Sequence, residues 1–146
     1  MAATAGQIAE AGRVPNERIA TTVRTSSVGS ITTTETEVDS VTAALVDGRT
    51  YRIRWAGPVQ STAGGDNIRL FIRQTNTSGA QLQLDNHQNQ ASSIKYGFIM
   101  EVEFTATSTA DHEFIASLIR LSGTGTISSV ASATQPAYLY VDYISG

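Results

Sequence analysis

The C-terminal segment most constrains the fold of this chain, because its bulky side chains alternate between two sets. The first set is Ala137, Leu139, Val141 and Tyr143, and the second is Tyr138, Tyr140, Asp142 and Ile144. This period of two, rich in β-branched and aromatic residues, predicts a β-strand that follows Pro136. Both faces carry large groups, which favours a strand inside a sheet that completes the fold by inserting between earlier strands.

Similar strand patterns recur every 10 to 15 residues from Ser26 onward. Thr50–Ala56 and Ile68–Thr75 place apolar residues on one face and arginines on the other. The weakly apolar Ser30–Val38 is expected at a sheet edge, and residues 85–93 are expected to form a long polar loop. The other expected strands are Val41–Leu45, Ala80–Leu84, Lys95–Thr107, Glu113–Leu121 and Thr126–Ala131. Together they predict an all-β fold, an antiparallel, jelly-roll-like β-sandwich of about eight strands.

The composition agrees with a β-protein and argues against a nucleic-acid partner, a membrane span and cysteine-based sites. Ser and Thr make up 34 of 146 residues, and such residues favour strands and turns. The net charge is −3, Lys95 is the only lysine and no basic cluster occurs, so no nucleic-acid partner is expected. No apolar run reaches the roughly 18–20 residues of a membrane span, and the N-terminus lacks signal-peptide features. Without cysteine, neither a disulfide nor a thiolate metal site can form.

Residues 1–25 differ from the rest in the spacing of their apolar residues. They are predicted to form an extended N-terminal arm, with residues 26–146 as the sandwich domain. The apolar residues of this arm are spaced too irregularly for a strand: Ile8, Val14, Ile19 and Val23. Asn16 is suited to cap a helical turn that begins at Glu17. The arm is either a frayed leader or a segment that docks on a neighbouring protein through these apolar residues.

Residues capable of catalysis are few and lack the spacing that catalysis needs. His87 and His112 lie in a polar loop and a turn without HxH or HExxH spacing, so solvated histidines are expected rather than metal ligands. Glu101 and Glu103 lie two apart on one strand face, as alternation places any solvent-facing pair. The loop carboxylates Asp66 and Asp85 do not form a calcium-loop pattern. The sequence therefore predicts a protein without catalytic residues, metals or cofactors, and a cell-wall hydrolase is the weakest alternative.

Two surface features are candidate binding sites. Arg52, Arg54, Arg69 and Arg73 would share one face if their strands were neighbours, opposite an acidic face of Glu35, Glu37, Glu101 and Glu103. Tyr138, Tyr140 and Trp55 are suited to stack on sugars, although their strand positions favour packing in the core or between subunits. The residues predicted to form an oligomer interface are Arg52, Arg54, Tyr138 and Tyr140.

Residues 26–146 resemble small β-sandwich domains in virion proteins of tailed bacteriophages, especially phages of actinobacteria. The resemblance is carried by Thr32–Trp55, Ser122–Ser132 and Pro136–Gly146. It implies a virion component, often a trimer, and assigns no catalytic residues. Because no fibre shaft precedes the domain, we expect a homotrimeric capsid decoration protein whose arm binds the major capsid protein or another virion protein. The alternative is a tail-associated receptor-binding module that recognises a host glycan through residues 60–67 and 85–93.

Overall fold

The computed structural model describes residues 16–146, which form ten β-strands and no helix. The N-terminal half contains β1 (Arg18–Arg24), β2 (Val28–Ile31), β3 (Thr36–Leu45), β4 (Thr50–Ser61) and β5 (Asn67–Gln74). The C-terminal half contains β6 (Gln81–Gln88), β7 (Tyr96–Thr105), β8 (Ala110–Ser122), β9 (Ile127–Ser129) and β10 (Ala137–Ser145). No helix in this part of the chain is long and apolar enough to cross a membrane.

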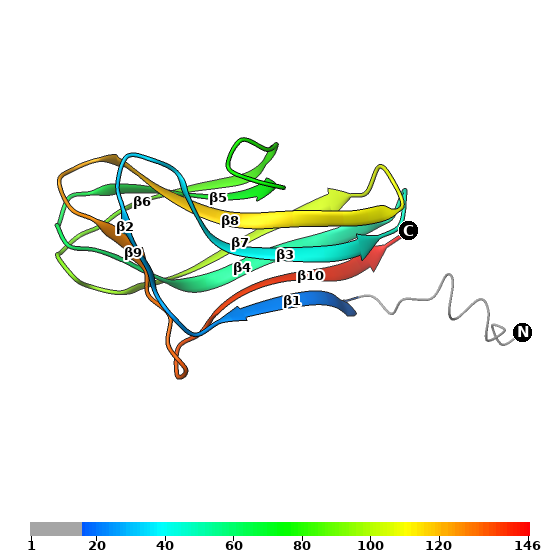
Figure 1. The fold of residues 1–146 in the computed structure, drawn as a ribbon, viewed down its shortest axis with the longest axis horizontal. Coiled ribbons are helices and arrows are strands. Elements are labelled where there is room, and N and C mark those ends of the chain that lie inside the picture. Colours follow the sequence, from blue (N-terminus) through cyan, green and yellow to red (C-terminus); the bar gives the residue numbers. More distant parts are fainter. Residues whose placement is uncertain (1–15) are drawn as a thin grey trace, which may run out of the picture.

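The strands form two antiparallel sheets packed face to face (Figure 1). In sheet A, β1, β10, β4 and β7 lie side by side. The short β9 pairs with the last residues of β4, past the start of β10, and β2 pairs with β9. Sheet B has the order β3-β8-β5-β6. The eight long strands can be numbered 1 to 8 along the chain, leaving out the short β2 and β9. In that numbering, sheet A has the order 1-8-3-6 and sheet B has the order 2-7-4-5. This order is that of a jelly roll, so the predicted fold class is confirmed.

Alternation within the strands builds the core between the sheets. Along β4, the buried residues Tyr51, Ile53 and Trp55 alternate with half-buried arginines. Along β10, Ala137, Leu139, Val141 and Tyr143 all point into the core. The strand prediction for Glu113–Leu121 is also confirmed, since this segment lies in β8 and buries Phe114, Ala116 and Leu118.

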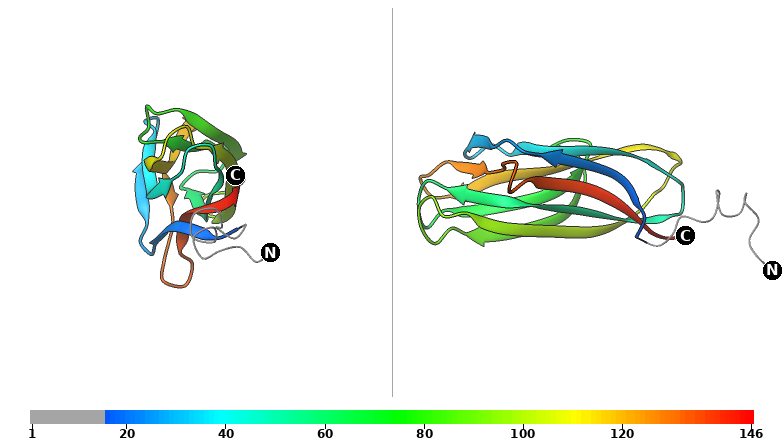
Figure 2. Two further views of the ribbon diagram at one scale, coloured as in Figure 1. Left: turned by 90° about the vertical axis from the view of Figure 1, so that its right-hand side faces the viewer. Right: turned by 90° about the horizontal axis from the view of Figure 1, so that it is seen from below.

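The last strand occupies the central place expected for it. β10 pairs with β1 on one side, as the red and blue strands of Figure 2 show, and with the first half of β4 on the other. Its partner β1 is the outermost strand at that end of sheet A. β10 is therefore hydrogen-bonded along both of its edges.

The N-terminal prediction differs from the structure within the described residues. The helical turn expected from Glu17 is wrong, because Arg18–Arg24 form β1 and Asn16 donates its N–H to the carbonyl of Tyr143 at 2.7 Å. The sandwich therefore takes in residues before the expected boundary at residue 26. Ile19 packs against the core and Val23 faces outward, so a strand forms despite irregular apolar spacing because β10 supplies its backbone partners. Ile8 and Val14 lie outside the described residues.

Two further sequence predictions are wrong in detail. Ser30–Val38 is not one edge strand, since β2 and β3 belong to different sheets and residues 32–35 turn between them. Residues 85–88 are not a loop but the end of β6, whose partner is β5. Polar side chains hid the second half of this strand because β6 lies at the edge of sheet B, where Asp85 and His87 stay half exposed.

One open edge of the sandwich is closed by a buried ion pair between the two layers. The guanidinium of Arg24 in β1 donates to both carboxylate oxygens of Asp39 in β3, at 2.9 and 3.2 Å. Asp39 also accepts a 2.7 Å hydrogen bond from the indole Nε1 of Trp55 in β4. The Arg24 and Asp39 side chains are only 10% and 2% exposed, so this cluster lies in a low-dielectric environment.

A second buried carboxylate fastens two loops at one end of the sandwich. Asp66 accepts hydrogen bonds from the Ser61 hydroxyl and from the backbone N–H groups of Thr124 and Gly125. A Cβ atom on Gly123 would overlap this carboxylate, and Gly123 also has φ 110, so only glycine fits there. All of these partners donate, so Asp66 has a structural role and does not leave its oxygens free for a cation.

Candidate functional site

The structure brings the four predicted interface residues together on the outer face of sheet A, the face that points away from the core. Arg52 and Arg54 lie on β4, and Tyr138 and Tyr140 lie on the adjacent β10. Tyr140 is directly opposite Arg54 in the strand pairing. Because directly paired residues of antiparallel strands point to the same side, these side chains are neighbours.

Charged side chains occupy the middle of this outer face. Arg18 pairs with Asp142, and its Cζ lies 3.5 Å from the centroid of the Tyr140 ring, a cation–π contact. Glu101 on β7 lies between Arg52 and Arg54, whose Nε atoms are 3.3 and 3.8 Å from its oxygens. Neither Nε has a hydrogen-bond acceptor, although both atoms are buried. The arginines thus have hydrogen-bonding capacity that the described chain does not use.

The charged stripes differ from those expected. Arg69 and Arg73 lie on β5 in sheet B, so they do not share a face with Arg52 and Arg54. Arg73 forms a bidentate pair with Glu35, at 2.7 and 3.0 Å. Separate basic and acidic faces are therefore wrong, because Glu101 lies beside Arg52 and Arg54, and Glu35 lies beside Arg73.

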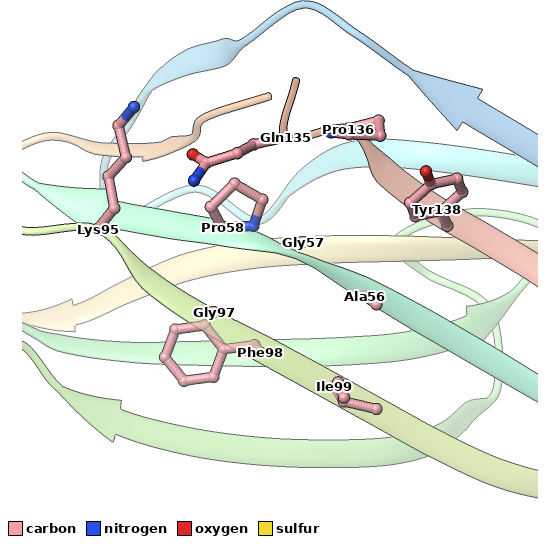
Figure 3. A pocket seen from close by; sticks show the side chains of 10 residues that line it. All are labelled: Ala56, Gly57, Pro58, Lys95, Gly97, Phe98, Ile99, Gln135, Pro136 and Tyr138. Carbon is pink, nitrogen blue, oxygen red and sulfur yellow. The ribbon is translucent and has the colours of Figure 1, made fainter. Parts of the chain in front are cut away.

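An apolar area adjoins the charged residues on the same outer face. Its most exposed side chains are Val23 (49%), Tyr138 (38%) and Ile99 (60%). Beside it is a shallow hollow of about 460 Å³, shown in Figure 3, lined by β4, β7 and the segment that enters β10. Tyr138, Gln135, Lys95 and Pro58 are among its lining residues. Ile99 was not predicted as part of this face. It alternates in register with Glu101 and Glu103, and an apolar residue on the same side of a strand as two glutamates is a signal that the sequence contains.

The residues considered for catalysis are not brought together. His87 is not the solvated loop residue that was expected, because it lies in β6 and its ring centroid is 4.6 Å from that of Tyr96 and 4.8 Å from that of Phe98. His112 lies in β8 rather than in a turn and contacts Ser108. Glu101 faces arginines, and Asp85 accepts a hydrogen bond from Gln83. Among residues 16–146, no three His, Asp or Glu side chains gather as metal ligands would.

The two loops predicted to recognise a glycan do meet. Asn89 and Asp66 are joined through their backbones, and the Asn89 amide donates to the carbonyls of Ala63 and Ala91 at 2.8 and 2.7 Å. Asn89 is fully buried, so it ties the loops together beneath the surface. Trp55 is 0% exposed and donates to Asp39, which removes it as a sugar-stacking platform.

The partly buried environment of the His87 ring predicts that the stability of the fold depends on pH. Burial lowers the pKa of His87, and its Nε2 is buried without a partner, so the fold favours the neutral ring. The unfolded chain binds the proton at about pH 6.5, so the free energy of unfolding should fall as pH drops below about 6.5 toward the lowered pKa. Urea titrations between about pH 5 and about pH 8 measure this slope. His87→Phe should flatten it, whereas a slope that survives in His87→Phe and disappears in His112→Gln contradicts the assignment.

Comparison with known proteins finds similarities of fold. No protein-family model and no curated protein matches the sequence. A family 6 carbohydrate-binding module is similar over 82% of this chain and 80% of its own, with 13% identity and a TM-score of 0.44. A chain of infectious bursal disease virus, Gt strain, is similar over 90% of this chain but only 39% of its own, with 9% identity and a TM-score of 0.44. At such scores, neither similarity transfers a function to this chain.

Proposed function

We propose that this chain is a non-enzymatic structural protein of a virion, specifically a capsid decoration protein that stabilises the head. The observation that carries the proposal is the outer face of sheet A, where Val23 of β1, Tyr138 of β10 and Ile99 of β7 are exposed in one row, with Ala56 of β4 between the last two. An exposed apolar area on the face of a sheet favours a contact with another protein chain. Arginines and carboxylates beside it supply the specificity that such contacts need.

The sequence resemblance to tailed-phage virion proteins supports the same function. Thr32–Trp55 includes β3 and the first half of β4, Ser122–Ser132 includes β9, and Pro136–Gly146 includes β10. These segments form the framework of the sandwich, so the resemblance concerns the architecture that such domains share. In the proposed protein, the N-terminal arm holds the major capsid protein, and Ile8 and Val14 are its apolar anchors.

The location of the protein in an intact phage particle tests this proposal directly. Gold-labelled antibodies against the chain should decorate the head in electron micrographs. Label confined to the tail would favour the receptor-binding alternative, and the absence of label from purified particles would contradict a virion role. The homotrimer expected from the resemblance stays a prediction, which the mass of the protein in solution measures.

Removing residues 2–15 should abolish attachment to the capsid and leave the sandwich folded. The cut is placed before β1, because a deletion to residue 25 would remove a strand that pairs with β10. Co-sedimentation with capsids that lack the protein measures attachment, and near-ultraviolet circular dichroism of Trp55 monitors the fold. The double variant Ile8→Asp and Val14→Asp keeps the length of the arm and controls for shortening. It should also lose attachment, because it removes the apolar anchors. Full attachment of the deleted chain would contradict an anchoring arm.

A host-glycan-binding module is the second candidate, favoured by the hollow beside Tyr138. There an exposed ring, the amide of Gln135 and the ammonium of Lys95 surround one concave area. Aromatic rings with nearby polar groups suit the apolar faces and hydroxyls of sugars. A glycan array with the full chain should show saccharide selectivity that Tyr138→Ala removes, whereas a decoration protein should show none.

A further inference from the structure

The outer face of sheet A has a regular layout across its four adjacent strands β1, β10, β4 and β7. The strand pairing defines three rows that run across these strands. The apolar row is Val23, Tyr138, Ala56 and Ile99; the mixed row is Thr21, Tyr140, Arg54 and Glu101; the charged row is Arg18, Asp142, Arg52 and Glu103. Arginines and carboxylates are equal in number on these rows, so the face carries no net charge.

We propose that this face binds the same face of a second copy of the chain, about a two-fold axis that runs parallel to the strands between β10 and β4. The product is a dimer, in place of the trimer that the sequence resemblance implies. Such an axis turns one copy over and reverses the order of its strands. β1 of one subunit then lies over β7 of its partner, and β10 lies over the partner's β4. Each row meets the same row of the partner in reverse order, which is the defining property of an isologous interface.

The charged row is complementary to its own reverse. Its signs alternate as plus, minus, plus, minus from β1 to β7, so reversal places every charge over its opposite. Arg18 faces Glu103 of the partner subunit, and Asp142 faces the partner's Arg52. Within the described chain Glu103 forms no ion pair, so the partner would supply its cation.

The other two rows are also complementary to their own reverse. In the mixed row, the Tyr140 ring faces the partner's Arg54, a cation–π arrangement that occurs twice by symmetry. In the apolar row, Val23 faces Ile99 of the partner subunit, which covers the most exposed apolar side chains of the face.

The alternative axis, perpendicular to the strands, gives a poor match. It would place the apolar row over the charged row, so that Val23 covers Arg18 and Tyr138 covers Asp142. Burying these charges against apolar groups is costly, since neither could form new polar contacts. The layout of the rows therefore selects the axis parallel to the strands.

The size of the face is adequate for a specific contact. The nine residues of β10 extend about 30 Å and four strands span about 19 Å, which gives roughly 600 Å² in projection. Standard interfaces bury about 800 Å² on each partner, which is the same order. Twisted sheets pack face to face at about 30°, so the match is closest near the axis, at Tyr140 and Arg54.

Sedimentation equilibrium of the full chain tests the proposal. The wild type should have about twice the monomer mass of 15.5 kDa, and Ile99→Asp should raise the dimer dissociation constant by at least about tenfold. The matched control is Leu121→Asp, an exposed residue of β8 in sheet B, which should leave the constant within about twofold. A monomer or a trimer of the wild type overturns the proposal, as does a dimer that Ile99→Asp leaves intact.

A charge exchange tests the two-fold geometry itself. Arg18→Glu would place two glutamates together across the interface, and Glu103→Arg would place two arginines together, so each variant alone should be monomeric at low salt. An equimolar mixture should recover the dimer, because the introduced glutamate of one chain then faces the introduced arginine of the other, while the second contact remains as in the wild type. Near-ultraviolet circular dichroism of Trp55 verifies the fold of both variants. If both variants are folded and the mixture stays monomeric, the two-fold arrangement is wrong.

Discussion

Asp39→Ala is expected to lower the free energy of unfolding by about 3–5 kcal/mol, the usual cost of breaking a buried ion pair. The change leaves the Arg24 guanidinium, 10% exposed, without its carboxylate between the two sheets. It also leaves the buried indole N–H of Trp55 without an acceptor. Urea unfolding monitored by the fluorescence of Trp55, the only tryptophan, measures the loss.

A control and a double variant separate the pair from its surroundings. Asp111→Ala, at an exposed position of β8, should change the free energy by less than about 0.5 kcal/mol. Adding Arg24→Met to Asp39→Ala should recover part of the loss, because the unpaired buried charge is then gone. A loss below about 1 kcal/mol for Asp39→Ala would mean that water reaches Arg24 and that the edge is not closed by this pair.

Asp66→Asn is expected to cost about 2–4 kcal/mol and to remove part of the acid sensitivity of the fold. Burial alone would raise the pKa of Asp66, but hydrogen bonds from Ser61, Gly125 and Thr124, together with nearby Arg120, outweigh burial and lower it. An amide cannot accept with both of its terminal atoms, so at least one of these donors loses its partner. The loop that contains Gly123 would then separate from residues 61–66.

The sign of the acid effect follows from the lowered pKa. A carboxyl whose pKa is lower in the folded state stabilises the fold at pH values above its pKa in the unfolded state, about 3.9. This contribution disappears as the pH falls through its pKa in the folded state. Unfolding of the wild type and Asp66→Asn should therefore be compared between about pH 2 and about pH 6. The stability difference should shrink toward the acid end, and the exposed control Asp111→Asn should differ little from the wild type in stability at about pH 6. A difference independent of pH would contradict a charged Asp66 in the fold.

The faces of individual strands could be predicted because alternation is a local property of the backbone. Tyr51, Ile53 and Trp55 point inward and Arg52 and Arg54 outward, as their period of two required. The same reasoning separated Tyr138 and Tyr140 from the inward set of β10. β1 and the second half of β6 could not be predicted, since edge strands remain half exposed and need few apolar side chains.

The candidate site was predictable only in part. Arg52, Arg54, Tyr138 and Tyr140 were grouped because each faces away from an apolar set, and the structure places them side by side. Arg18 and Ile99, which complete the same face, lie far away in the sequence and depend on β1 and β7 as neighbours. The Arg24–Asp39–Trp55 cluster gave no sequence signal, since its members come from three strands and two sheets.

The sequence by itself determined which side chains of the long strands point toward a core and that the last strand is apolar enough to lie within a sheet. The tertiary structure alone decided which outward side chains become neighbours, because strand order depends on contacts between distant segments rather than on local pattern. Arg52 and Arg69 illustrate the difference, since both alternate with apolar residues in the same way. β4 joined sheet A and β5 joined sheet B, so only Arg52 lies on the face with Tyr140.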